Sequence, residues 1–271
     1  MNRKVHLIPD FENIEKSLIL EKKYDAAFEY NDFFNPSLLE DEKALKERIA
    51  FYKSLDRDRK NDTLHGVFFD ITLNSSDPAI KKISEERCIS SLDIATELGV
   101  SGVIFHTNYL ANFKAKYYED SWVNLNRDFW IKMLKRYENL CIYIENMFDE
   151  EPELLVRLIE KVKSSDELTE KEKDRFGICF DYAHANAFGH DLSVWEDAVA
   201  PYVMHMHIND NDLNVDLHQT MGDGMIDWER FNRFVQKKNI ESSVLVEVKD
   251  LKSQSDSVEY MKENGIYPYD R

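Results

Sequence analysis

The sequence contains no long apolar stretch. Residues 1–9 hold no hydrophobic segment of the kind found at the centre of a secretory signal peptide, and no later run approaches the roughly 18 apolar residues of a membrane-spanning helix. Low-complexity tracts, sequence repeats and linkers rich in proline and glycine are also missing. These absences predict a soluble protein with no membrane partner and no export signal, folded as one domain over residues 1–271.

Cysteine is scarce, and basic residues are outnumbered by acidic ones. The three cysteines, Cys88, Cys141 and Cys179, are odd in number and widely spaced, which predicts free thiols in a reducing cytoplasm and no zinc site built from cysteine. The chain carries 35 Lys and Arg residues against 52 Asp and Glu residues, so its formal net charge is -17. A charge of this sign opposes general attraction to phosphate backbones. Nucleic acid is therefore not an expected partner, although a local basic patch stays open.

Apolar residues are plentiful, at 43% of the 271 residues, so the chain can bury a large core. Apolar runs typical of buried strands alternate with amphipathic segments typical of helices, and this pair recurs eight times. The expected strands cover residues 5–8, 26–30, 64–71, 102–105, 141–144, 176–180, 202–206 and 243–246. The expected helices cover residues 13–23, 41–55, 84–98, 126–139, 152–162, 192–199, 227–238 and 253–264. Residues 163–174 are expected to form a charged, solvated connection.

Repeated strand–helix units predict a parallel sheet with right-handed crossovers. Eight such units in a chain of this length favour a fold of the α/β class, a single-domain (β/α)8 TIM barrel. In that fold the loops at the C-terminal ends of the strands carry the active site.

Polar residues gather at those strand ends and in the loops that follow. They are His65, His106, Glu145, Asp181, His184, His207, Asp216, His218 and Glu247. Imidazole and carboxylate groups together suit zinc, manganese or iron better than calcium or magnesium, which prefer oxygen ligands. Any one of the histidines could instead be a hydrogen-bonded or surface residue. Nine such residues at matching strand ends nevertheless predict a metal site.

Two pairs within this set carry most of that prediction. Asp181 and His184 are three residues apart on an expected strand-to-loop turn, so both can point at one ion, although such a pair also occurs as a plain hydrogen bond. Glu145 and Glu247 end strands that are otherwise apolar. An unpaired carboxylate would be costly there, so a cation or an arginine partner is expected beside each, and no arginine is near either of them in the sequence.

Seven motifs at the strand ends resemble one known superfamily. They are Leu64-His65-Gly66, Val103-Ile104-Phe105-His106, Ile144-Glu145-Asn146, Cys179-Phe180-Asp181-Tyr182-Ala183-His184-Ala185, His207-Ile208-Asn209-Asp210, Asp216-Leu217-His218 with Gly222-Asp223-Gly224, and Val246-Glu247-Val248. The pattern resembles the xylose isomerase-like TIM-barrel superfamily, which includes sugar-phosphate isomerases and epimerases and the zinc-dependent apurinic endonuclease IV family. The resemblance covers nearly the whole chain.

The two branches of this superfamily imply different metal sites. In the endonuclease branch, residues at all nine positions hold three zinc ions. In the isomerase and epimerase branch, the residues matching Glu145, Asp181, His207 and Glu247 hold a single ion, commonly manganese. The resemblance therefore implies one to three divalent ions, zinc or manganese, per chain.

The catalytic roles that the resemblance implies also differ between the branches. In an isomerase or epimerase, Glu145 and Glu247 move a proton of a metal-bound sugar, and His184 contacts the substrate. In a phosphoesterase, Glu145 or Glu247 bridges two ions and His184 is a ligand. A relative that binds a metal without catalysis is a third possibility.

Departures from the family patterns narrow the choice of substrate. Leu217 stands where the endonuclease pattern has an arginine, and Val248-Lys249-Asp250 replaces a Thr-Pro-Gly turn. Residues 212–214 contain no arginine, although sugar epimerases of this superfamily usually have one there. The rim loops are rich in carboxylates, and the exceptions are Lys114, Lys116, Lys249 and Lys252. An enzyme for abasic DNA needs a cationic track for several phosphates.

These features together predict a metal-dependent enzyme for a small carbohydrate or phosphorylated substrate. An isomerase or epimerase is the simplest assignment, and a multinuclear zinc phosphoesterase is the alternative.

Overall fold

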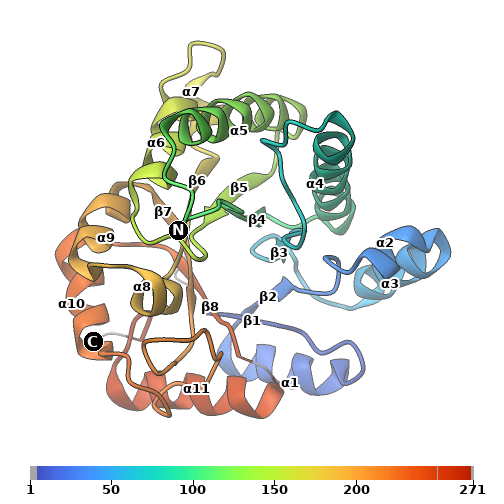
Figure 1. Cartoon of the computed structure of the whole chain (residues 1–271). Coiled ribbons are helices and arrows are strands. Elements are labelled where there is room, and N and C mark those ends of the chain that lie inside the picture. Colours follow the sequence, from blue (N-terminus) through green and yellow to red (C-terminus); the bar gives the residue numbers. More distant parts are fainter. Residues whose placement is uncertain (1–4, 249, 270–271) are drawn as a thin grey trace. The chain divides into compact units, whose positions relative to one another are not determined.

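The computed structural model describes residues 5–248 and 250–269, so Lys249 lies outside the described residues. Eight strands follow one another around a closed barrel in chain order, which confirms the predicted TIM barrel (Figure 1). They are β1 (Val5–Leu7), β2 (Ala27–Tyr30), β3 (Thr63–His65), β4 (Gly102–His106), β5 (Cys141–Glu145), β6 (Phe176–Asp181), β7 (Val203–Ile208) and β8 (Ser243–Val246). The pairs β1–β2, β1–β8, β3–β4, β6–β7 and β7–β8 are parallel.

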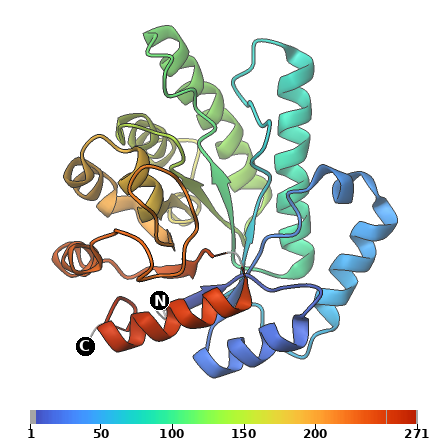
Figure 2. The same ribbon diagram turned by 60° about the horizontal axis from the view of Figure 1, so that its bottom comes forward.

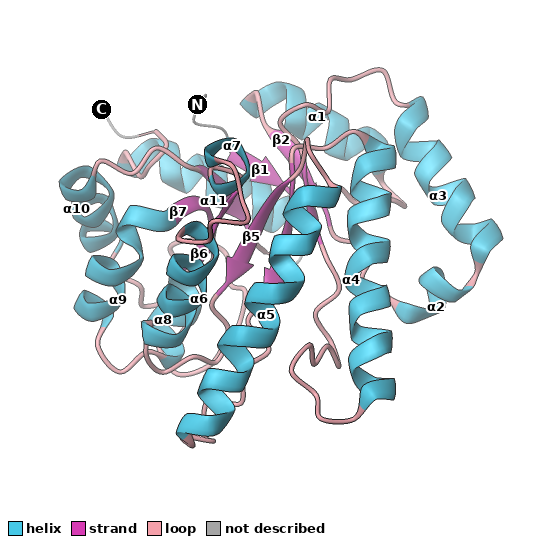
Figure 3. Cartoon of the chain, turned by 90° about the horizontal axis from the view of Figure 1, so that it is seen from above, coloured by secondary structure: helices cyan, strands magenta, loops and turns pink. Residues whose placement is uncertain are grey.

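Helices alternate with these strands (Figure 3). They are α1 (Ile14–Tyr24), α2 (Pro36–Glu40), α3 (Glu42–Ser54), α4 (Pro78–Leu98), α5 (Lys116–Arg136), α6 (Glu153–Lys163), α7 (Glu170–Lys173), α8 (Tyr182–Phe188), α9 (Leu192–Val199), α10 (Trp228–Lys238) and α11 (Leu251–Asn264), with the 3-10 helix η1 (Ala200–Tyr202) before β7. Within the described residues, none of the helices combines the length and the apolar composition needed to cross a bilayer.

The chain divides into two compact units, and each is described by itself. The first unit comprises the described residues of 1–29, 145–153 and 178–271, and the second comprises 30–144 and 154–177.

In the first unit, α1 and α11 pack side by side (Figure 2). An aromatic layer joins β6 to the helices that follow it. Phe180 of β6 stacks on Trp195 of α9 with ring centroids 6.1 Å apart, and Tyr182 of α8 meets Phe231 of α10 at 4.9 Å. All four side chains are fully buried. Large aromatic side chains contribute much of the apolar area in such a layer, so α8 is held firmly behind the end of β6.

In the second unit, β3 and β4 are paired and end at His65 and His106. A Cβ atom at Gly66 would lie 2.5 Å from the Phe105 ring, so a glycine is needed where the chain leaves β3. Phe105 in turn packs on Trp130 of α5, with ring centroids 4.9 Å apart.

Three elements are bounded differently from the prediction in the second unit. Helix α4 begins at Pro78, after the N-cap Asp77, instead of at residue 84. Strand β3 ends at His65 instead of residue 71, because Val67 N–H donates to Ser91 Oγ of α4 instead of to a neighbouring strand. Helix α5 begins at Lys116 instead of residue 126. Its first turns bury only one face, on which Trp122 and Val123 lie, and the charged residues around them hide that face in the sequence pattern.

Short helices also occupy segments that were expected to be irregular. Within the connection 163–174, Thr169 and Glu172 form a capping box that starts α7. Residues 182–188 form helix α8, so Asp181 caps a helix and His184 lies on its first turn, where a strand-to-loop turn was expected.

Candidate metal centre

The nine predicted ligands all lie at or after the C-terminal ends of strands, and seven of them belong to the first unit. Glu145 and Asp181 end β5 and β6, His207 is in β7, and Glu247 follows β8. His184 is in α8, and Asp216 with His218 lies in the loop between β7 and α10. His65 and His106 belong to the second unit.

The first group of ligands surrounds His207. Its Nδ1 lies 3.3 Å from Glu145 Oε1 and 3.2 Å from Glu247 Oε2, and all three side chains are largely or fully buried. Although burial opposes the shift, His207 and His218 hold the pKa of the Glu247 carboxyl below its ordinary value. The structure therefore brings two carboxylates and one imidazole together, as the sequence predicted.

Asp181 joins this group through one of its two oxygens. Oδ1 caps helix α8 by accepting the His184 N–H at 2.6 Å. Oδ2 is buried, and no described residue donates a hydrogen bond to it. Burial raises the pKa of Asp181 to about 7; the His184 charge opposes the shift, and the Glu247 and Glu145 carboxylates add to it. A cation at Oδ2 would remove this penalty.

The second group consists of His184, Asp216 and His218. His184 Nδ1 lies 2.9 Å from the Asn146 carbonyl oxygen, and His218 Nδ1 lies 2.9 Å from the Glu247 carbonyl oxygen. A carbonyl oxygen only accepts, so each Nδ1 carries a hydrogen. The two Nε2 atoms then point at one oxygen, Asp216 Oδ2, at 3.3 Å from His184 and 2.9 Å from His218.

The charges in this second group are strongly coupled. Burial lowers the pKa of both imidazoles, but the neighbouring carboxylates outweigh it. Asp181, Asp216 and Glu145 hold the pKa of His184 well above its ordinary value, and Glu247 with Asp216 raises the pKa of His218 to about 10. The two histidines in turn lower the pKa of Asp216, against its burial. In the absence of a metal ion, protons on the histidines balance these carboxylates.

The second unit repeats this histidine geometry. His65 Nδ1 lies 3.0 Å from the Gly66 carbonyl oxygen and therefore carries a hydrogen. Its Nε2 lies 3.2 Å from His106 Nε2. The Phe68 ring packs against both imidazoles, with centroids 5.1 Å from His65 and 4.9 Å from His106. The two predicted ligands of this unit thus face each other through the nitrogens available for a metal.

These donors fit a divalent metal of the zinc or manganese class. In His184 and His218 the hydrogen on Nδ1 is held by a main-chain carbonyl, which is the usual arrangement of a histidine that binds a metal through Nε2. Lone pairs of imidazole and carboxylate at such short distances repel unless a proton or a cation lies between them. Mixed nitrogen and oxygen ligands suit zinc and manganese.

Asn146 organises the site, although no role was predicted for it. Its side-chain amide donates to the Asp181 carbonyl at 2.9 Å and accepts the Asp181 N–H at 3.0 Å. Its own carbonyl holds His184 Nδ1. One residue after Glu145 therefore fixes both Asp181 and His184, and its place beside Glu145 was the only signal in the sequence.

Asp210 is a second residue whose role was missed. It was expected to add to the acidic rim, but it is buried and holds the loop that carries Asp216 and His218. Its carboxylate accepts N–H groups of Gly222 at 2.9 Å, of Ile226 at 3.1 Å and of the Trp228 indole at 3.1 Å. Asp149 is also buried and accepts the Met147 N–H. The rim therefore presents fewer free carboxylates than the sequence suggested.

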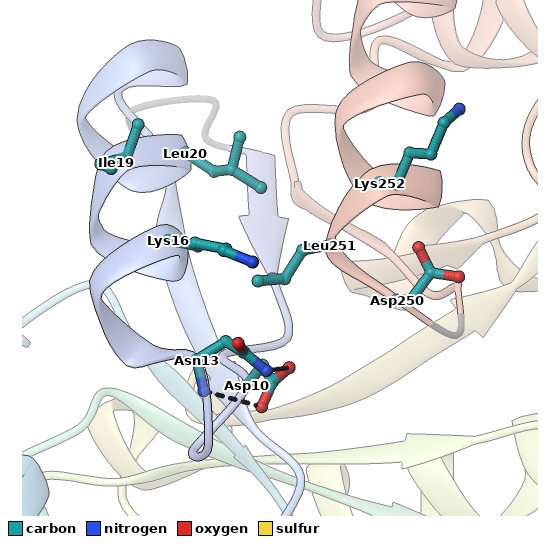
Figure 4. Close-up of a pocket in the computed structure, with 8 residues that line it drawn as sticks. All are labelled: Asp10, Asn13, Lys16, Ile19, Leu20, Asp250, Leu251 and Lys252. Atoms are coloured by element: carbon teal, nitrogen blue, oxygen red, sulfur yellow. Dashed lines mark hydrogen bonds between the residues drawn. The ribbon is translucent and has the colours of Figure 1, made fainter.

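A cavity of about 490 Å³ lies between α1 and α11 (Figure 4). It is lined by Asp10, Asn13, Lys16, Ile19, Leu20, Asp250, Leu251 and Lys252. None of the nine predicted ligands lines it, and its charged side chains are of both signs. Among the described residues no histidine or cysteine lines it, so the histidine and carboxylate groups remain the candidate site.

Comparison with known proteins identifies the family to which this barrel belongs. A family model described as "Xylose isomerase-like TIM barrel" matches residues 23–264. A probable endonuclease 4 of Campylobacter curvus is 26% identical over 208 residues, which cover 71% of this chain and 72% of that protein. The solved structure of the TTHB071 protein from Thermus thermophilus, soaked with ZnCl2, has a TM-score of 0.75 and 21% identity, over 96% of this chain and 97% of that one. A D-tagatose 3-epimerase-like protein has a TM-score of 0.74 and 22% identity, over 96% of each chain. The chain belongs to the xylose isomerase-like TIM barrel family.

Proposed function

We propose that the chain is a metal-dependent enzyme that takes two or more divalent ions and hydrolyses the phosphoester bond of a small substrate. The observation that carries this proposal is the pair His184 and His218, which both direct Nε2 at Asp216. A site for one ion needs only the group around His207. A second, separately organised group of ligands supports a second ion. The sequence alone favoured an isomerase, and the position of His184 shifts the balance.

Two sets of residues would hold the ions. Glu145, Asp181, His207 and Glu247 form one set, and His184, Asp216 and His218 form the other. His65 and His106 are proposed as further ligands, as the family resemblance implies. When bound, such ions stabilise charge on phosphoryl oxygens and lower the pKa of water. The carboxylates of the two sets would balance the charge of the ions, and Glu145 and Glu247 both lie within 3.3 Å of His207 Nδ1.

The proposed substrate is small, and we place the enzyme in the cytoplasm. The net charge of -17 and the scarcity of cations after the strands oppose binding of a nucleic acid backbone. The three cysteines are free, which agrees with a reducing compartment. The relative in Campylobacter curvus, a probable endonuclease 4, supports phosphoester chemistry at this kind of site.

An isomerase or epimerase of a sugar or sugar phosphate is the second candidate. The observation in its favour is the pair of carboxylates, Glu145 and Glu247, which lie within 3.3 Å of the same nitrogen of His207. One carboxylate can remove a proton from a carbon of the substrate while the other returns it, as this chemistry requires. His184 would then contact substrate. The fold shared with a D-tagatose 3-epimerase-like protein is compatible with this assignment.

The number of metal ions per chain separates the two candidates. We expect elemental analysis of the protein, purified and loaded with zinc or manganese, to give two or three ions per chain, and His184→Gln to lose at least one. Hydrolysis of small phosphomonoesters and phosphodiesters should follow the metal content. A single ion per chain that His184→Gln retains would contradict the proposal and favour the isomerase.

Activity measurements complete this test. Glu145→Gln should abolish turnover while the barrel stays folded, because it removes a charge from the centre of the site. Glu151→Gln, a variant of an exposed carboxylate in the following loop, should keep full activity. Turnover of a panel of sugars and sugar phosphates, without hydrolysis of phosphoesters, would support the isomerase. Cleavage of an abasic DNA duplex at low salt would overturn the assignment of a small substrate.

A further inference from the structure

Glu29 of β2 is a fully buried carboxylate that the proposed ligand sets do not include. Its Oε1 lies 3.1 Å from His207 Nε2, and its Oε2 lies 3.1 Å from His205 Nε2. His205 Nδ1 lies 2.6 Å from Ser243 Oγ of β8. All of these residues belong to the first unit, and Glu29, His205 and His207 are each 0% exposed.

The direction of these contacts can be derived from their chemistry. A carboxylate only accepts, so His205 donates the hydrogen of Nε2 to Glu29 Oε2. If His205 is neutral, its Nδ1 then accepts the hydroxyl hydrogen of Ser243. Burial opposes the charge on Glu29, but the two histidines hold the pKa of its carboxyl well below the ordinary value. Glu29 is therefore an ionised acceptor that faces two imidazoles.

We propose that Glu29 is a positioning residue of the metal centre: it keeps the hydrogen of His207 on Nε2, so that Nδ1 is left to bind the ion with Glu145 and Glu247. Nε2 faces Glu29 Oε1, whereas Nδ1 faces the two ligand carboxylates at 3.3 and 3.2 Å. A carboxylate behind a metal-binding histidine fixes the tautomer and the ring orientation, and it makes the ligand nitrogen more basic. The inference rests on the proposed metal centre.

A purely structural role is the competing explanation. Glu29 could serve only to balance the charge of two buried histidines, since removing one partner of a buried ionic contact is destabilising. In that case its removal would lower the stability of the metal-free protein and leave the zinc affinity of the folded protein unchanged. Zinc affinity and folding stability must therefore be measured separately.

The test compares zinc affinity in wild type and Glu29→Gln, by competition with a chromophoric chelator. The glutamine side chain has the same shape but no charge, and it can accept through only one of its two terminal atoms. We expect its zinc dissociation constant to rise about 10- to 100-fold. Asp62→Asn is the matched control, because Asp62 is a buried carboxylate of the second unit, paired with Arg57 and Tyr30. That variant should lose stability but keep its zinc affinity.

The outcomes separate this inference from the proposed function. If wild type binds no zinc, the metal centre itself is wrong and the inference fails with it. If wild type binds zinc and folded Glu29→Gln binds it equally well, only the role of Glu29 is overturned. If Glu29→Gln does not fold, nitrogen NMR of the zinc-loaded wild type decides. A His207 with its hydrogen on Nε2 supports the inference, and one with its hydrogen on Nδ1 overturns it.

Discussion

At the scale of single residues, three histidines of this site share one hydrogen-bonding arrangement. In His65, His184 and His218 a main-chain carbonyl accepts the hydrogen of Nδ1. Nε2 is then left to face a neighbouring side chain that is also a proposed metal ligand. His207 is the reverse, because Nε2 faces Glu29 and Nδ1 faces the ligand carboxylates. The difference follows from position. His207 lies within β7, where Glu29 of β2 reaches its Nε2, whereas the other three histidines end strands or follow them.

His218 is also held in an unusual backbone conformation. Its φ angle is +47°, in the left-handed region that residues other than glycine rarely adopt. Strained backbone of this kind persists where surrounding contacts determine it, and it is common at functional sites. The contacts of His218 with Asp216 and with the Glu247 carbonyl provide that constraint.

The first prediction concerns the pH dependence of the metal-free protein. The pKa of His218 is raised to about 10 in the fold, above its ordinary value of 6.5, by Glu247 and Asp216. Its stabilising contribution is therefore complete below pH 6.5 and is lost as the pH rises through about 10. In the presence of a chelator, His218→Gln should destabilise the protein clearly at pH 6 and much less at pH 10.5, as measured by urea unfolding.

A matched control guards against general effects of alkali. His190 is 61% exposed and lies outside the cluster, so His190→Gln should show almost the same difference from wild type at both pH values. Lysine and tyrosine residues titrate in every variant and cancel from the comparison. A destabilisation by His218→Gln that stays constant from pH 6 to pH 10.5 would contradict the assigned charge of this residue.

The sequence drew attention to the proposed ligands more readily than to the residues that position them. Glu145 and Glu247 stood out because a carboxylate at the end of an apolar strand needs a partner. Glu29 lies inside the expected strand 26–30 and not at its end, and no family motif drew attention to it. Asn146 and Asp210 act through main-chain groups of residues distant in the sequence. Such contacts have no periodicity and no spacing rule, so only the folded chain reveals them.

At the scale of elements, all eight strands were predicted in order, and the errors fall at their boundaries. Alternation of apolar runs with amphipathic segments is a property of long segments, so it indicates which elements exist. The end of β3 depends instead on one hydrogen bond from Val67 to Ser91, and the start of α8 depends on the Asp181 cap. A strand-to-loop turn was predicted at Asp181, and a helix follows the strand there for that reason.

The loop between β7 and α10 is the element that completes the second ligand group. It carries Asp216 and His218, and Asp210 at its beginning holds its far end through Gly222 and Ile226. An isolated antiparallel β-bridge pairs the main chains of Asp210 and Gln219 within the same loop. A Cβ atom at Gly224 would lie 2.3 Å from Asp210 Oδ1, so the carboxylate fits closely against the loop backbone. The ligands of this loop are therefore held in place before any ion binds.

The second prediction tests this element with Asp210→Asn. Each carboxylate oxygen accepts two N–H groups, so an asparagine leaves two buried donors without an acceptor. Each such donor costs about 1–3 kcal/mol. We expect a loss of unfolding free energy of that order per donor, and loss of the ion held by Asp216 and His218. Chemical denaturation and elemental analysis measure the two effects.

Two further variants make this test specific to the contact. Gly224→Ala should reproduce both effects, because the added methyl group meets the same carboxylate. Asp223→Asn changes an exposed carboxylate of the same loop and should alter neither. Full metal content in folded Asp210→Asn would show that the loop keeps its ligands in place by other means.

At the scale of the whole molecule, the proposed metal centre would couple metal binding to folding. An ion that binds the folded chain and not the unfolded chain stabilises the fold by an amount that grows with the free metal concentration. The buried carboxylates and imidazoles of the first unit repel one another or hold protons when no ion is present, and an ion removes both costs. The metal-free protein should therefore be the less stable form, even though its fold is the same.

The third prediction follows from this coupling. At a free zinc concentration about 100 times the dissociation constant, binding at one site adds about 2.7 kcal/mol. For a chain of this size that corresponds to a rise in Tm of roughly 5–10 °C over the chelator-treated protein, and two independent sites would add their effects. Calorimetry at a series of buffered zinc concentrations measures this rise in Tm.

Asp216→Ala should remove the contribution of the second group and keep that of the first, because Glu145, His207 and Glu247 are untouched. Magnesium should raise the Tm far less, since it prefers a shell of oxygen ligands and water. Equal Tm values with zinc and with chelator would mean that the buried charges are balanced within the protein alone, and the metal centre would then have to be abandoned.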